Sequence, residues 1–174
     1  MPVHVALLRA VNVGGTGKLP MAELRAICEG LGFAGVETYI QSGNVLFRSD
    51  LSAGEAEAVL DEALARRLGK APGVMIRSAA ELAALVAGNP FPQAKPNVLM
   101  VNFLPGEMPA EPLAGLVAPD GEAVHVGTRE IWVHYPNSSG RSKFRLPALK
   151  RATSRNLNTV AKLADLAAAL ERRL

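Results

Sequence analysis

Residues 3–24 have the sequence VHVALLRAVNVGGTGKLPMAEL, and this stretch decides the fold class. Val3–Leu8 is short, apolar and rich in β-branched residues, which predicts a buried strand. A glycine-rich loop follows, from Arg9 to Leu19. Pro20 then favours the start of a helix, because proline suits the first helical position. The apolar residues of this helix recur at helical spacing, at Met21, Leu24, Ile27, Cys28 and Leu31.

The residues that follow complete a β-α-β-β-α-β pattern. Segments 36–41 and 44–49 predict two strands joined by a two-residue hairpin turn, Ser42-Gly43. Ser52 and Glu55 have the spacing of a capping box, which starts a helix that ends near Gly69. Residues 73–77 predict a fourth strand. This order is that of a ferredoxin-like module, so we expect residues 1–78 to form a ferredoxin-like α+β subdomain.

The same pattern begins again, in weaker form, in the second half. A short helix is expected to run from Ser78 to Gly88, and the Asn89-Pro90-Phe91-Pro92 break then separates the modules. Residues 97–104, 122–126 and 130–135 predict strands, and residues 110–117 and 144–151 predict weak helical segments. A last helix is expected over 157–173. We therefore expect residues 79–174 to form a second α+β subdomain, a degenerate β-α-β-β-α copy with a C-terminal helix.

Composition places the chain among ordinary globular proteins. Its 174 residues are enough to bury roughly 70% of the unfolded surface, so it needs no disulfide or metal to fold. The single cysteine, Cys28, rules out an intrachain disulfide, and its place on an apolar stripe predicts a buried structural thiol. The first residues carry no basic leader, and no apolar run approaches the ~20 residues that span a bilayer. We expect a cytoplasmic protein with no membrane partner.

Charge is unevenly spread along the chain. Residues 141–174 hold nine Lys and Arg against two acids, a formal charge of +7. The other 140 residues hold ten against fourteen, a formal charge of −4. A basic tail on an acidic body indicates an anionic partner, and it fits equally a tail whose charges pair with its own body. Both interpretations stay open at this stage.

The ferredoxin-like topology predicts where the polar loops of the first module meet. The loop after the first strand, the start of the first helix and the tip of the 41–44 hairpin should share one edge of the sheet. The helix start adds its free amides and partial positive charge, which suit a phosphate or carboxylate. Alternatively, the glycines serve only the turns and the amide side chains cap backbone groups. The candidate ligand-binding residues at this edge are Arg9, Asn12, Gly14, Gly15, Lys18, Gln41, Ser42 and Asn44.

A second polar cluster, residues 153–160, precedes the last helix. Capping of that helix accounts for one or two residues of the cluster, which contains six polar residues. The surplus either forms a hydrogen-bond network between the subdomains or lines a site. The candidate ligand-binding residues here are Arg155, Asn156, Asn158 and, one turn further on, Lys162.

Known nucleotide and metal motifs are not matched. Gly14–Lys18 lies between a predicted strand and helix, but a P-loop needs a glycine where Asn12 stands and a hydroxyl residue where Leu19 stands. The glycine spacing also fails the dinucleotide fingerprint. The three histidines, His4, His125 and His134, fall in predicted strands with no partner at ligand spacing. We therefore expect no metal and no cofactor, and the sequence names no catalytic residue.

Several joined motifs resemble a known family. They are LLRAVNVGG at 7–15, Lys18, MAEL at 21–24 and YIQSGNV at 39–45, followed by Arg-Asn at 155–156 and Asn-Thr-Val at 158–160. Together they are similar to the signatures of the bacterial domain-of-unknown-function family 1697. The resemblance implies a pair of small α+β subdomains and no assigned activity. Ala10 stands where glycine is usual in the family, and Leu157 where an aromatic residue is frequent.

Three hypotheses for the function follow. The first is binding of an anionic ligand, either a nucleotide-like small molecule or nucleic acid, at the predicted edge. The second is an enzyme acting on a phosphorylated or carboxylated small substrate, with Glu23 or a histidine as the candidate base. The third is a structural or interaction protein, in which the polar clusters form a seam between the subdomains. Nothing in the sequence predicts the oligomeric state.

Overall fold

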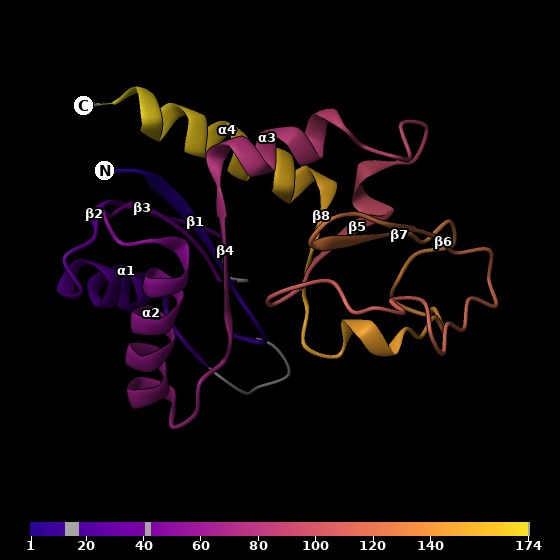
Figure 1. Cartoon of the computed structure of the whole chain (residues 1–174), viewed down its shortest axis with the longest axis horizontal. Helices are drawn as coiled ribbons and strands as arrows, with labels where there is room; N and C mark the ends of the chain where they lie inside the picture. The colour runs from indigo at the N-terminus through magenta and orange to yellow at the C-terminus, as the bar shows by residue number, and fades with distance from the viewer. Residues whose placement is uncertain (13–17, 41–42, 174) are drawn as a thin grey trace. The chain divides into compact units, whose positions relative to one another are not determined.

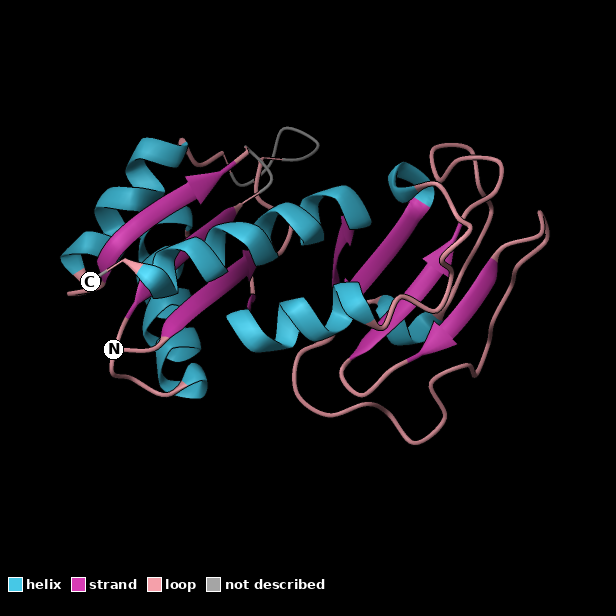
Figure 2. Ribbon diagram, turned by 90° about the horizontal axis from the view of Figure 1, so that it is seen from above, coloured by secondary structure: helices cyan, strands magenta, loops and turns pink. Residues whose placement is uncertain are grey.

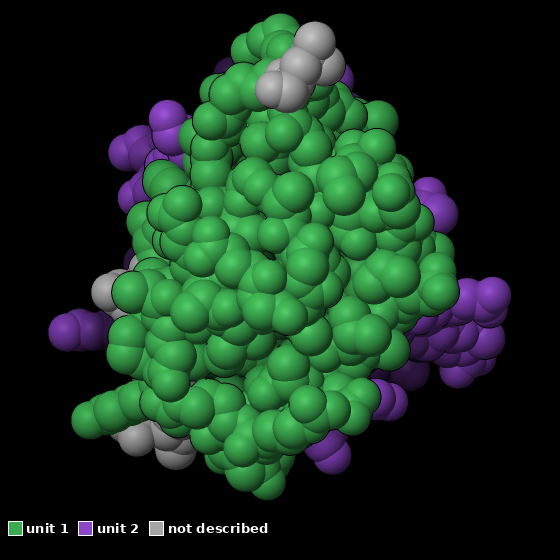
Figure 3. Space-filling model, turned by 90° about the vertical axis from the view of Figure 1, so that its left-hand side faces the viewer, with its two compact units in different colours: residues 1–84, 163–174 green, residues 85–162 purple. Residues whose placement is uncertain are grey.

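The computed structural model describes residues 1–12, 18–40 and 43–173 (Figure 1). The chain forms two compact units, which Figure 3 distinguishes by colour. The first unit contains residues 1–84 and 163–174, and the second contains residues 85–162. In the described part of the chain, no helix combines the length and apolar character that crossing a bilayer requires.

The first unit is built on a four-stranded antiparallel sheet with the strand order β2-β3-β1-β4. This order and the β-α-β-β-α-β sequence of elements confirm the predicted ferredoxin-like α+β fold. The elements are β1 (Val3–Leu8), α1 (Met21–Gly30), β2 (Ala34–Tyr39), β3 (Asn44–Arg48), α2 (Ala53–Leu68), β4 (Val74–Ser78) and α3 (Ala79–Ala87).

The boundaries of α2 follow from the residues that flank it. The Ser52 hydroxyl accepts a hydrogen bond from the Glu55 amide at 3.1 Å, and the Glu55 carboxylate accepts one from the Ser52 amide at 3.0 Å. This is the predicted capping box. Gly69 ends the helix with φ +87°, a left-handed conformation that glycine adopts without a Cβ penalty.

Both faces of the first sheet are covered. Helices α1 and α2 pack on one face, over a core that includes Ala6, Leu8 and Phe47. The last turns of α4 (Leu157–Arg172) belong to the same unit and lie on the other face (Figure 1). The Arg48 guanidinium donates to the carbonyl oxygens of Leu170 and Arg173, which ties these turns to β3.

The second unit repeats the strand order of the first. Its sheet runs β6-β7-β5-β8, again with every neighbouring pair antiparallel (Figure 2). If β5 is matched to β1 and the others in turn, the two orders are identical. The elements are η1 (Pro96–Val98), β5 (Leu99–Phe103), β6 (Ala123–Val126), β7 (Glu130–His134), η2 (Pro147–Leu149) and β8 (Thr153–Asn156).

Details of the repeat differ from the sequence-based expectations. Residues 110–117 form turns instead of a weak helix, because Pro112 removes a helical donor and Gly115 has φ +75°. The helical segment expected over 144–151 is only the short 3-10 helix η2. Residues 153–156 belong to the polar cluster that was expected only to precede the last helix, and they form the fourth strand β8.

The two units also divide the chain differently from the predicted subdomains, 1–78 and 79–174. The difference arises because the last turns of α4 contact the first sheet, where the Arg173 guanidinium also pairs with Glu37 of β2. That residues 1–78 fold as an independent subdomain stays a prediction.

Burial of Cys28 has a consequence for the pH dependence of stability. Desolvation, with a smaller contribution from the Glu29 charge, raises the pKa of the Cys28 thiol from its ordinary value of 9.0 to about 12. Between these pH values the unfolded chain binds fewer protons than the folded chain, so the free energy of unfolding falls as the pH rises. The fall should be about 1.4 kcal/mol per pH unit. The free energy of unfolding of the wild type and of Cys28→Ala can be measured by urea unfolding at several pH values. We expect the additional decrease above pH 9 in the wild type alone. Parallel pH profiles would contradict the assignment.

Candidate functional site

One end of the first sheet gathers the segment after β1 and the hairpin tip between β2 and β3. The Leu8 amide donates to the Gly43 carbonyl at 2.9 Å, and Leu7 pairs in register with Asn44. A Cβ on Gly43 would lie only 2.5 Å from Val11 Cγ2, and its φ is +87°. Gly43 is therefore required by both its backbone conformation and this close approach. The structure thus brings the segment after β1 against the hairpin, as the topology predicts.

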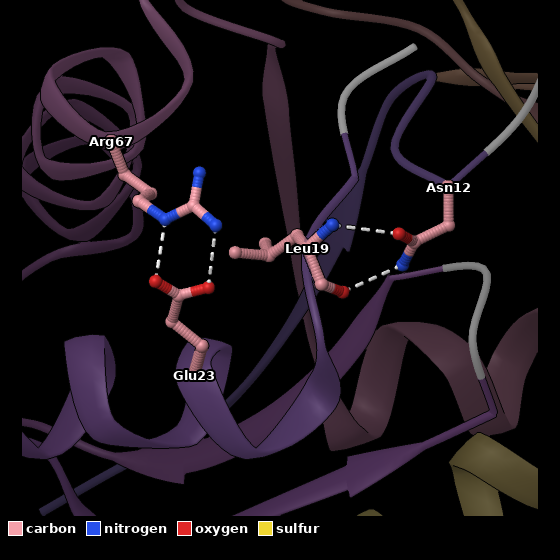
Figure 4. Close-up of polar contacts among 4 residues, drawn as sticks. All are labelled: Asn12, Leu19, Glu23 and Arg67. Carbon is pink, nitrogen blue, oxygen red and sulfur yellow. Dashed lines mark hydrogen bonds and ion pairs between the residues drawn. The ribbon is translucent and has the colours of Figure 1, made fainter. Parts of the chain in front are cut away.

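Asn12 closes the loop that follows β1. Its side-chain Nδ2 donates to the Leu19 carbonyl at 2.8 Å, and its Oδ1 accepts from the Leu19 amide at 2.7 Å (Figure 4). Two hydrogen bonds from one amide group hold the two ends of the loop at a fixed separation. Of the predicted site residues, Gly14, Gly15, Gln41 and Ser42 lie outside the described residues.

The other predicted residues at this edge differ in their environments. Asn44 is fully buried and donates from Nδ2 to the Tyr39 carbonyl at 3.0 Å, across the hairpin. Arg9 is half-buried, and its backbone amide donates to the Gly73 carbonyl at 3.0 Å. Lys18 is exposed. Asn12 and Asn44 thus shape the edge, whereas Lys18 presents its charge to solvent.

Backbone strain is concentrated at the same edge. Four non-glycine residues in the described part of the chain have positive φ, and three of them lie here. They are Ala10 at +53°, Asn12 at +58° and Ile40 at +52°. Asparagine tolerates this conformation, but for alanine it costs roughly 1–2 kcal/mol, and for a β-branched residue it is a genuine outlier. Such strain persists only where the surroundings enforce it, and it clusters at functional sites.

Glu23, at the start of α1 beside this loop, is already paired. Arg67 of α2 contacts both carboxylate oxygens, with 2.8 Å between Nη2 and Oε2 (Figure 4). These hydrogen bonds lower the pKa of Glu23 from its ordinary value. A carboxylate held in this way is a poor proton acceptor, which weakens its candidacy as a general base.

The second polar cluster lies in the second unit and also has structural roles. Arg155 on β8 is buried, and its Nη1 donates to the Thr153 hydroxyl at 2.6 Å. Burial lowers the pKa of Arg155 to about 10. Asn156 accepts from the Thr159 amide at 3.0 Å and so caps the start of α4. Asn158 and Lys162 are exposed on α4.

Arg155 has a counterpart in the first unit that the sequence did not single out. Arg77 on β4 is fully buried and pairs in register with Val5, as Arg155 pairs with Val101. In both arginines, Nη1 donates to the carbonyl of the preceding residue at 3.0 Å. The only sequence signal was an arginine inside the apolar strand sequence Val-Met-Ile-Arg.

A second matched pair begins the third strand of each sheet. Asn44 is opposite Leu7, and Glu130 is opposite Phe103 at the equivalent position of the second sheet. Both polar side chains are buried. The repeat therefore extends from strand order to individual buried polar positions. Glu130 was missed because its strand, Glu-Ile-Trp-Val-His, is no different from an ordinary strand with a polar first residue.

The predicted site residues therefore fall into two groups. Arg9, Asn12, Lys18 and Asn44 belong to the first unit, and the cluster over 155–162 belongs to the second. That both groups serve one ligand stays a prediction. Within the described ranges, no group of three or more His, Cys, Asp or Glu side chains is placed to hold a metal ion.

Comparison with known proteins identifies the family. The family model described as "Protein of unknown function (DUF1697)" matches residues 1–132. The chain belongs to the DUF1697 family. A solved structure of the conserved bacterial protein SP0830 from Streptococcus pneumoniae is similar in fold, with a TM-score of 0.80 and 24% sequence identity. The match covers 95% of this chain and 98% of that one. Among curated proteins, none matches the chain.

The Asn12 clamp is expected to matter for stability. Asn12→Ala removes both hydrogen bonds to Leu19 and leaves the backbone amide and carbonyl of Leu19 without these partners. We expect the free energy of unfolding to fall by about 1–3 kcal/mol. Asn158→Ala, the same change at an exposed helical position, is expected to leave stability unchanged or slightly raised. Denaturant unfolding measures both, and equal stability of the two variants would contradict the proposed clamp.

The resemblance to the DUF1697 family implies glycine at position 10, and the φ of +53° at Ala10 gives a physical reason for that preference. Ala10→Gly relieves the left-handed strain and adds unfolded-state entropy, so we expect no loss of stability and a gain of up to about 1 kcal/mol. Ala58→Gly, in the exposed middle of α2, should instead cost about 0.5–1 kcal/mol. The two melting temperatures should move in opposite directions or differ clearly. If both variants lose stability equally, Ala10 is not strained in solution.

Proposed function

We propose that the chain binds an anionic, phosphate-bearing ligand at the edge formed by the segment after β1, the start of α1 and the β2–β3 hairpin. The ligand is either a nucleotide-like small molecule or the backbone of a nucleic acid, which present the same chemistry. The observation that carries the proposal is the clustering of left-handed, non-glycine backbone at this edge, where Ala10 and Ile40 are strained and Asn12 adopts the same conformation.

The charges of this edge favour an anion. Lys18 lies within the loop that Asn12 closes and is exposed, and Arg9 precedes this loop. The acidic residue in the first turn of α1, Glu23, is neutralised by Arg67. The start of α1 adds a partial positive charge of its own. An incoming phosphate therefore meets cationic and amide groups whose backbone is already held in place, which lowers the entropy cost of binding.

A structural role is the competing proposal, and specific contacts favour it. Asn12, Asn44 and Asn156 all bond to backbone groups of their own unit. These contacts explain the amide side chains without a ligand. They do not explain why Ala10 and Ile40 adopt a costly backbone conformation. The enzyme hypothesis gains no base from Glu23, so we do not extend the proposal to catalysis.

Two probes with the same phosphate chemistry distinguish the sources of the ligand. Binding of ATP and of a fluorescent single-stranded 20-mer to the full chain is measured at about 50 mM and 200 mM salt. Because a nucleic acid releases counterions, its affinity should fall at least tenfold between these salt concentrations, whereas that of a compact nucleotide should fall less.

Variants that each remove one positive charge test whether the probe binds at this edge. Arg9→Gln and Lys18→Gln should each weaken the bound probe by about tenfold, since each removes a hydrogen bond to a charged group. Arg172→Gln is the matched control, because Arg172 is an exposed cation in the same unit at the opposite end of the sheet. We expect it to bind as the wild type does. Failure of both probes to bind, or an equal loss in all three variants, would contradict the proposal.

A further inference from the structure

A pocket of about 510 Å³ lies in the second unit and plays no part in the site above. Two segments form most of it, the Pro-rich stretch after α3 and the end of β7, and the residues that matter here are Pro90, Phe91, Pro92, Lys95, His134 and Pro136. The sequence contains this stretch as an apparent linker between modules, with no functional signal. Pockets of 300–1,000 Å³ are the usual size for small-molecule ligands.

The walls of the pocket are rigid. The Phe91 amide donates to the Asn89 side chain at 2.8 Å, and the Ala94 amide donates to the Phe91 carbonyl at 3.0 Å. The Tyr135 amide donates to the Val98 carbonyl at 2.9 Å, which ties the second half of the segment to β7. Three lining prolines further restrict the backbone. The pocket is therefore pre-formed, so ligand binding costs little conformational entropy in the protein.

The pocket surface suits a flat ring. The ring centroids of Phe91 and His134 are 6.0 Å apart with 31° between their planes, so the pocket is lined by two neighbouring aromatic rings. Of the seven other described lining residues, five are apolar, and three of these are prolines. Aromatic rings pack on such surfaces in offset or tilted arrangements that add to the gain from burial.

The charged lining of the pocket is positive. Lys95 is exposed at the pocket and is the one Lys or Arg among the described lining residues, none of which is acidic. A cation at the mouth of an apolar pocket favours a ligand with one carboxylate outside its buried ring. We infer that this pocket binds a small planar aromatic carboxylate, with its ring on Phe91 and His134 and its carboxylate toward Lys95.

The test uses 2-naphthoate and its uncharged analogue 2-naphthamide on the ¹⁵N-labelled full chain. We expect 2-naphthoate to shift the amide signals of the non-proline residues of 91–98 and of residues 134–135, and to bind about fivefold tighter than 2-naphthamide. No shifts at about 2 mM 2-naphthoate, or shifts confined to other regions, would overturn the inference.

Two variants separate the charge from the ring. Lys95→Gln should remove the preference for the carboxylate and leave 2-naphthamide binding unchanged, whereas Arg151→Gln, an exposed cation at the other end of the second sheet, should keep the preference. Phe91→Ala should weaken both probes by about fivefold or more. Lys95 is exposed, so its variant keeps the test decisive even if Phe91→Ala fails to fold. A preference that survives Lys95→Gln would overturn the assignment of the carboxylate.

Discussion

The rest of the first unit depends on the central place of β1 in its sheet. β1 is buried along its whole length and forms antiparallel ladders with both β3 and β4. With these two ladders made, the chain must leave β1 at the end of the sheet where the β2–β3 hairpin turns and where β4 begins. The loop after β1, the hairpin tip and the Gly73 turn then meet. The position of the candidate edge is therefore a consequence of strand order, and the side chains at this edge determine only its chemistry.

That edge is held more tightly than a surface loop requires. Gly43 contacts Val11 so closely that no side chain fits, Asn12 clamps Leu19, and Ala10 and Ile40 adopt left-handed backbone. Each of these features lowers conformational freedom at some cost in strain or entropy. Strained or restricted backbone of this kind is typical of sites where function requires a fixed geometry. The same argument applies to the proline-walled pocket of the second unit, where rigidity comes from ring constraint in place of strain.

The two sheets share their strand order although the elements between the strands differ. Within its described residues, the second unit has no α-helix between β5 and β6 or between β7 and β8, where the first has α1 and α2, but it has the same strand order and a buried arginine in its fourth strand. Buried cations are costly unless well bonded, and the guanidinium groups of Arg77 and Arg155 each donate to the preceding carbonyl. Ladder hydrogen bonds use backbone groups alone, and they tolerate sequence drift that helix packing does not.

The sequence by itself determined the fold class, the capping box of α2, the buried thiol and the approximate limits of nearly every strand, because these depend on local periodicity and short-range spacing. It also identified the polar residues of both clusters. Only the tertiary structure decided that residues 153–156 complete a sheet, because this polar segment becomes a strand through its pairing with β5. Only the tertiary structure showed that Asn12 and Asn44 bond to backbone, that Ala10 and Ile40 are strained, and that the Pro-rich linker walls a pocket. Each of these depends on contacts between residues that local sequence patterns do not relate.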